Sequence, residues 1–65
     1  MAHTWMTADE RKAIIIEAAR SIAADRGVEY INGQAVADAC RVPTSRETVK
    51  RYFRMSELRA LVAAE

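Results

Sequence analysis

The sequence has little of several residue types on which other fold classes depend. Its 65 residues include two glycines, one proline and one cysteine. The shortage of glycine and proline disfavours a β-rich fold with many tight turns, and the lone Cys40 excludes an intramolecular disulfide. Wholly apolar runs are only a few residues long, far too short to cross a bilayer, and residues 1–5 lack the features of a signal peptide. These absences favour a small helical protein in a reducing, cytoplasmic compartment, with no membrane partner.

Patterns of catalytic and metal-binding residues are also missing. The sequence contains no recognisable Ser/His/Asp set, carboxylate pair or glycine-rich phosphate loop, so we expect no enzymatic activity and no cofactor. The single histidine, His3, has no second histidine or nearby cysteine with which to hold a metal. A chain this short also buries too little surface for a large pocket or a separate effector-binding domain. No small-molecule effector is therefore expected to bind within it.

Charge is distributed unevenly along the chain. Hydrophobic residues make up 51% and charged residues 29%, the balance of a folded protein, and the net charge is only +1. Residues 41–54, however, carry +4, because five cations stand against Glu47 alone, whereas residues 1–40 carry −2. A basic block of this density favours a polyanionic partner.

The first helix is expected over residues 8–26. Thr7 and Glu10 form a capping box at its start, and apolar residues then recur at helical spacing. Gly27 ends it, because only glycine takes the left-handed C′ conformation without steric cost. The apolar connector 28–31 should pack onto the core. Residues 1–6 are expected to form an N-terminal arm, and residues 7–65 one all-α domain.

Three shorter helices are expected after the connector. Asn32 is the predicted N-cap of the second, which extends to Cys40 with the thiol buried. Thr44 and Glu47 offer a capping box for the third, which extends to about residue 54. Ser56 is the predicted N-cap of the fourth. The apolar stripe of this last helix consists of Leu58, Leu61 and Val62.

The second and third helices have the features of a helix-turn-helix. Ala37 supplies the small residue that a close helix crossing requires, and Val42 the apolar residue of the turn. Val49 and Phe53 form the inward face of the third helix, so a helical wheel turns its charged residues outward. The outward face consists of Glu47, Lys50, Arg51 and Arg54, with Arg46 and Thr48 at its flanks. A DNA major groove is the surface that such a face would meet.

Five stretches of the sequence form a combination typical of one protein family. They are RKAIIIEAA at 11–19, DRGVE at 25–29, VADACRV at 36–42, TVKRYF at 48–53 and SEL at 56–58. Together they resemble the DNA-binding domain of the TetR family of bacterial transcriptional repressors. The chain departs from that family at the turn, where Arg41 replaces the usual glycine and the stretch 43–47 is longer. Arg41 therefore requires either an unusual backbone angle or a changed turn. The family's C-terminal effector-binding and dimerisation domain has no counterpart in these residues.

The resemblance implies a small three-to-four-helix domain that binds double-stranded DNA. It places Gln34 at a base or phosphate contact and Thr48 at the start of the recognition helix. Lys50 replaces the family's phosphate-contacting tyrosine. Tyr52 matches an aromatic residue whose ring packs while its polar edge faces the DNA backbone.

The chemistry of the basic block adds further candidates. Arginine pairs bidentately with guanine or with phosphate, which favours Arg46 and Arg51, and Ser45 lies beside them. The predicted DNA-contacting residues are Gln34, Thr44, Ser45, Arg46, Thr48, Lys50, Arg51, Tyr52 and Arg54.

The function predicted from the sequence is a sequence-specific transcriptional regulator, a repressor that occupies its operator. Two alternatives stay open: a protein-interaction or anti-repressor module on the same scaffold, and an architectural accessory protein of recombination. The apolar residues Trp5, Met6 and Leu61 either close the small core or mediate pairing, and a homodimer on an inverted repeat is expected.

Overall fold

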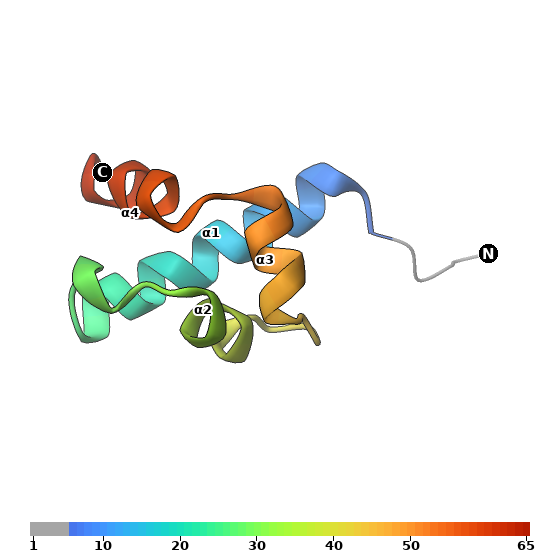
Figure 1. Cartoon of the computed structure of the whole chain (residues 1–65), viewed down its shortest axis with the longest axis horizontal. Coiled ribbons are helices and arrows are strands. Elements are labelled where there is room, and N and C mark those ends of the chain that lie inside the picture. The colour runs from blue at the N-terminus through green and yellow to red at the C-terminus, as the bar shows by residue number, and fades with distance from the viewer. Residues whose placement is uncertain (1–5) are drawn as a thin grey trace.

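The computed structural model describes residues 6–65 and is all-helical over that range, which confirms the predicted class. The elements in Figure 1 are α1 (Ala8–Asp25), the 3-10 turn η1 (Val28–Tyr30), α2 (Gly33–Ala39), α3 (Arg46–Tyr52) and α4 (Met55–Ala63). The predictions for His3 and Trp5 concern residues outside the described range. No helix in residues 6–65 has both the length and the apolar character that a membrane span requires.

Helix α1 is the central element of the fold. The expected capping box is present at its start: the Thr7 hydroxyl accepts from the Glu10 amide at 3.1 Å, and Glu10 accepts from the Thr7 amide at 2.9 Å. Its apolar face contacts α2, η1 and α4. The side chains buried on that face are Ile14, Ile15, Ala18, Ala19 and Ile22. Its first half lies at the N-terminal end of the molecule and its second half beside α2 and η1 (Figure 1).

Gly27 ends α1 in a conformation different from the expected one. The helix stops at Asp25 with Arg26 as its C-cap, and Gly27 has φ +119° and ψ 155°. The predicted positive φ is confirmed, but the prediction that Gly27 lies in the left-handed helical region is wrong. This combination is an extended region that essentially only glycine enters. The chain turns back after α1 into η1 (Figure 1), and no other described residue has a positive φ.

The connector and α2 begin largely as the sequence predicts. Ile31 is fully buried, whereas Tyr30 beside it is 51% exposed. The Asn32 side chain accepts from the Ala35 amide at 2.9 Å, which confirms the predicted N-cap. The helix ends one residue early, with Cys40 as its C-cap in extended geometry, so the thiol is half-buried rather than buried as expected.

Helix α4 begins earlier than predicted and covers α1. Its N-cap is Arg54, whose carbonyl accepts from the Leu58 amide at 2.9 Å, so the expected Ser56 cap is wrong. The backbone is already extended at Arg54, and helical geometry therefore starts at Met55, before Ser56. Leu58 and Val62 are buried, while Leu61 is 37% exposed.

Two polar contacts hold α4 in place. The Arg20 guanidinium makes a bidentate pair with the Glu65 carboxylate, both N···O distances being 2.6 Å. Arg59 Nε donates to the carbonyl of Ile31 at 3.0 Å in a half-buried setting. The first contact attaches the end of α4 to α1, and the second attaches its middle to the entry of α2.

Candidate nucleic-acid interface

The turn between α2 and α3 accommodates Arg41 without a strained backbone. Cys40 has φ −64° and ψ 139°, so the chain leaves α2 in an extended conformation and needs no glycine. Arg41 Nε pairs with Glu17 Oε1 of α1 at 3.0 Å. Val42 is half-buried, and its carbonyl accepts from the Thr44 hydroxyl at 3.0 Å. The sequence left two possibilities for Arg41, an unusual backbone angle or a changed turn. The structure has the changed turn.

Helix α3 is capped by Ser45, not by the predicted Thr44–Glu47 box. Ser45 Oγ accepts from the Thr48 amide at 3.1 Å and shares a further hydrogen bond of 2.9 Å with the Thr48 hydroxyl. The Thr44 hydroxyl instead donates to the turn, and no helix amide donates to it. The helix therefore begins at Arg46, one residue later than a Thr44 cap would require.

The cations of α3 are exposed and lack carboxylate partners. Ion pairs within 4.0 Å among the described residues join Arg20 to Glu65, Arg26 to Asp25 and Arg41 to Glu17. None of these pairs includes a residue of α3. The exposed cations of α3 are Arg46, Lys50 and Arg51. Ion pairs within the described residues therefore do not neutralise the positive charge of α3.

The far end of the predicted recognition helix differs from expectation. The third helix was expected to reach about residue 54, but α3 ends at Tyr52, with Phe53 as its C-cap. The extended backbone at Phe53, with φ −142° and ψ 143°, breaks the helical wheel there. Arg54 is exposed but lies at the N-cap of α4, so its place on the outward face of the third helix is wrong. The half-buried rings of Tyr52 and Phe53 pack against the core.

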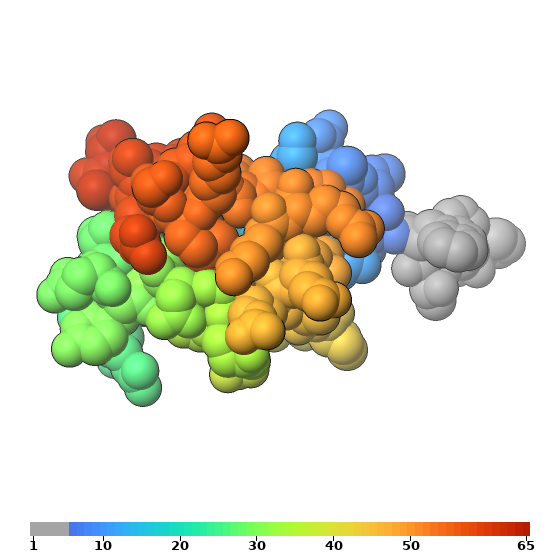
Figure 2. All heavy atoms as spheres, in the orientation of Figure 1, coloured from blue at the N-terminus to red at the C-terminus, as the bar shows by residue number. Residues whose placement is uncertain are grey.

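Gly33, directly before Gln34, lies close to α3. A Cβ built on Gly33 would lie 2.8 Å from Arg46 Cγ and 3.1 Å from Lys50 Cε, so these side chains lie over the start of α2. Gln34 follows on the exposed surface of α2, where its Nε2 donates to Asp38 Oδ1 at 2.9 Å. In Figure 2 the gold-to-orange atoms of α3 adjoin the yellow-green atoms of α2 on the viewed face.

The residues that the structure brings together in this region define what we call the α3 surface. It consists of Ser45, Arg46, Thr48, Lys50 and Arg51. Gln34 pairs with Asp38 on α2 and lines a cleft between α1 and α2 instead. Thr44 lies in the turn, Tyr52 packs inward and Arg54 lies beyond the helix. Gly33 was missed from the sequence, although a glycine directly after an N-cap was a visible signal.

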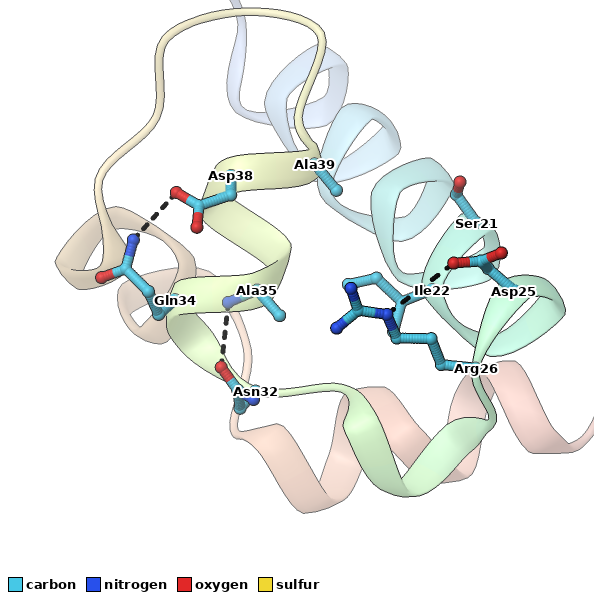
Figure 3. Close-up of a pocket in the computed structure, with 9 residues that line it drawn as sticks. All are labelled: Ser21, Ile22, Asp25, Arg26, Asn32, Gln34, Ala35, Asp38 and Ala39. Atoms are coloured by element: carbon cyan, nitrogen blue, oxygen red, sulfur yellow. Dashed lines mark hydrogen bonds and ion pairs between the residues drawn. The ribbon is translucent and has the colours of Figure 1, made fainter.

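An open cleft of about 620 Å³ lies elsewhere, between the second half of α1 and α2 (Figure 3). Its lining residues are Ser21, Ile22, Asp25, Arg26, Asn32, Gln34, Ala35, Asp38 and Ala39. Figure 3 shows Arg26 turned toward Asp25, at an N···O distance of 3.7 Å, and Gln34 toward Asp38. With two carboxylates and one cation, this cleft does not suit a polyanion, and the α3 surface is the better candidate for one.

Metal-ligand groupings and known relatives give no further assignment. No group of three or more His, Cys, Asp or Glu side chains within residues 6–65 is arranged to hold a metal ion. No protein-family model, no curated protein and no solved structure matches the chain. The case for a function therefore depends on the residues of the chain itself.

Proposed function

We propose that this protein is a sequence-specific DNA-binding transcriptional regulator that presents the α3 surface to a major groove. One observation carries the proposal: Arg46, Lys50 and Arg51, three of the seven residues of α3, are exposed cations without a carboxylate partner within 4.0 Å. Unpaired cations grouped on one helix are the electrostatic footprint of a nucleic-acid partner.

The dimensions and attachment of α3 support this role. A helix with its side chains is about 10–12 Å across, and a B-DNA major groove is about 12 Å wide. Val49 is the one buried residue of α3, and the main helix contact of α3 is with α2. The exposed side of α3, which carries Arg46, Lys50 and Arg51, is thus available to a groove while α2 crosses the backbone, as in a helix-turn-helix.

The chemistry of the α3 surface divides into two roles. Lys50 and Arg51 suit phosphate oxygens, which determine where the protein sits on the duplex but carry little sequence information. Arg46 and Thr48, in the first turn of α3, suit base edges, since arginine matches the O6 and N7 acceptors of guanine. Arg54, exposed at the start of α4, is an additional phosphate contact.

The regulator we propose acts as a repressor in the cytoplasm and binds an inverted repeat as a homodimer. A single recognition helix reads few base pairs, so a two-fold pair of half-sites raises specificity. The exposed Leu61 on α4, at 37% of its possible exposure, supports α4 as the pairing element. Occupation of the operator by this dimer would exclude the transcription machinery.

Salt dependence of binding to a duplex of mixed sequence tests the phosphate contacts. Binding is measured by fluorescence anisotropy over a series of salt concentrations, for the wild type and for Lys50→Ala, Arg51→Ala and Arg54→Ala. Each substitution should flatten the slope of log affinity against log salt by about 0.9. Arg20→Ala is the matched control: it removes one positive charge that is paired with Glu65, and its slope should match that of the wild type. Unchanged slopes in all three test variants would contradict the assignment.

Selection of preferred sites from a random duplex library tests sequence reading. Arg46→Ala or Thr48→Ala should relax the preference at one position by about 1–3 kcal/mol. Leu61→Glu should abolish cooperative binding to an inverted repeat and leave half-site binding intact. Binding of one protein per site at every concentration would contradict the dimer. Absence of any duplex binding at low salt would favour the protein-interaction module instead.

A further inference from the structure

Gly33 has a backbone conformation that any residue could adopt. It is the first residue of α2, and of the two glycines only Gly27 has a positive φ. Gly33 is also buried, although it directly follows an exposed N-cap residue. Conformational freedom therefore does not explain glycine here. A glycine at an ordinary helical position points to close packing instead.

The side chains of two α3 cations occupy the space that a side chain at position 33 would need. An ideal Cβ on Gly33 would lie 2.8 Å from Arg46 Cγ, 3.6 Å from Arg46 Cδ and 3.1 Å from Lys50 Cε. The first distance is shorter than real Cβ contacts allow. Because the crowded atom Cγ is near the base of the Arg46 side chain, movement of the guanidinium alone cannot relieve the overlap. The whole side chain would have to leave its place.

Arg46 and Lys50 are four residues apart and therefore lie on the same side of α3. Two like charges at this spacing repel each other, and both side chains have many alternative rotamers in water. Packing of the aliphatic stems over the Gly33 backbone opposes both effects, because the stems gain contact while the charged ends stay in solvent. The absence of a side chain on α2 thus orders two cations of α3.

We propose that Gly33 is a positioning residue that holds Arg46 and Lys50 in the arrangement needed for contact with DNA. This inference rests on the proposed function, since it assigns to Gly33 a role at the same surface. Gly33 itself touches no ligand in this proposal. It acts through Arg46 first, whose Cγ is the closest atom, and through Lys50 second.

The test compares Gly33→Ala with the wild type for DNA binding and for folding. The probe is the mixed-sequence duplex used above, measured by anisotropy over the same salt series, and folding is followed by urea unfolding. We expect the affinity to fall on the order of tenfold, the equivalent of one lost contact. The salt slope should flatten by up to about 0.9 for each cation displaced. Folding should be retained, since alanine is the better helix former.

A double-mutant cycle separates positioning from a general effect on structure. Arg46→Ala removes the Cγ and Cδ atoms that Gly33→Ala would displace. In the Arg46→Ala background, Gly33→Ala should therefore reduce DNA affinity by clearly less than in the wild type, since only Lys50, whose Cε lies 3.1 Å from the Cβ, is left to displace. A full tenfold loss in that background would show that Gly33→Ala acts without Arg46, and would overturn the inference.

The remaining outcomes distinguish this inference from the proposed function. Equal affinity and equal salt slope for Gly33→Ala and the wild type would overturn the role of Gly33 and leave DNA binding intact. No duplex binding by the wild type would overturn both. If Gly33→Ala lowers the midpoint of unfolding, addition of Arg46→Ala should restore it, and failure to do so would show that Arg46 is not the crowded group.

Discussion

The helices α1 and α3 differ in how many side chains they bury and in how many other elements they contact. The buried side chains of α1 include Ile14, Ile15 and Ile22, and its neighbours are α2, η1 and α4. Helix α3 buries Val49 alone and has α2 as its main neighbour. One helix supplies most of the buried face of the core, and the other adds Val49 and the half-buried Tyr52 to it.

The same two helices also differ in the ion pairs that their charged side chains make. Arg20 and Glu17 of α1 are paired with Glu65 and Arg41 respectively, while Arg11 and Lys12 of the same helix belong to no ion pair within residues 6–65. No carboxylate within residues 6–65 pairs with Arg46, Lys50 or Arg51. Helix α1 thus attaches two other parts of the chain through ion pairs, whereas α3 makes no such attachment within the described range.

The largest expected effect is the loss of stability when a core side chain of α1 is truncated. Ile15 is fully buried, so Ile15→Ala should lower the free energy of unfolding by about 2–5 kcal/mol, from lost burial and the cavity left behind. Arg51→Ala on α3 should change it by no more than about 0.5 kcal/mol. Urea unfolding followed by circular dichroism measures both. Comparable losses in the two variants would show that α3 is part of the structural core.

Gly27 tests whether the exit from α1 depends on backbone conformation. Gly27→Val should cost about 1–3 kcal/mol because φ +119° is strained for any residue with a Cβ. Gly27→Ala is the informative control in thermal unfolding. If alanine is tolerated and only valine destabilises, the cause is crowding by the γ carbons of valine and not the strain of φ +119°, since alanine and valine both add a Cβ there.

The local stability of α3 depends on its N-cap. Ser45→Ala should lower the free energy of unfolding by about 1 kcal/mol, because the Thr48 amide loses its partner. Thr44→Ala should have a smaller effect, since the Thr44 hydroxyl contacts the turn and not the helix. A larger loss of stability for Thr44→Ala than for Ser45→Ala would instead support the Thr44 cap that the sequence predicts.

The smallest effect is a pH dependence at the end of α4. The hydrogen bond from Arg20 lowers the pKa of Glu65 below its ordinary value. A lowered carboxyl pKa stabilises the fold above the ordinary pKa, and the contribution disappears as the pH falls through the lowered one. Because both side chains are exposed, the effect on stability is small. Titration of the Glu65 carboxyl carbon by NMR should show a higher pKa in Arg20→Ala than in the wild type. Equal pKa values in the two proteins would show that Arg20 and Glu65 do not pair in solution.

Features set by neighbouring residues along the chain were the most predictable from the sequence. The capping box at Thr7, the Asn32 cap and the positive φ of Gly27 each involve only nearby groups. The apolar spacing of Ile15, Ala18, Ala19 and Ile22 predicted the buried face of α1, because the 3.6-residue period determines which side chains share a side.

Some features depend on a choice between two suitable caps or on residues far apart in the chain. These features were less predictable from the sequence. Thr44 and Ser45 are both suitable caps, and the structure uses Ser45, while the Thr44 hydroxyl donates to the Val42 carbonyl. The end of α3 at Tyr52 moved Arg54 off the predicted face, which no periodicity indicates. Arg41 counted toward the basic block in the sequence, but Glu17, 24 residues away, pairs with it in the structure.

The packing of α1 against α4 also has a consequence for biosynthesis. The chain is made from its N-terminus, and the apolar face of α1 emerges long before Leu58 and Val62, which complete the core around it. At about 5–20 residues per second, the interval between synthesis of Ile15 and of Leu58 is roughly 2–9 s. During that time the isoleucines of α1 have no α4 to cover them. A nascent chain stalled before residue 58 should therefore recruit the chaperones that bind exposed apolar segments, and the completed chain should release them.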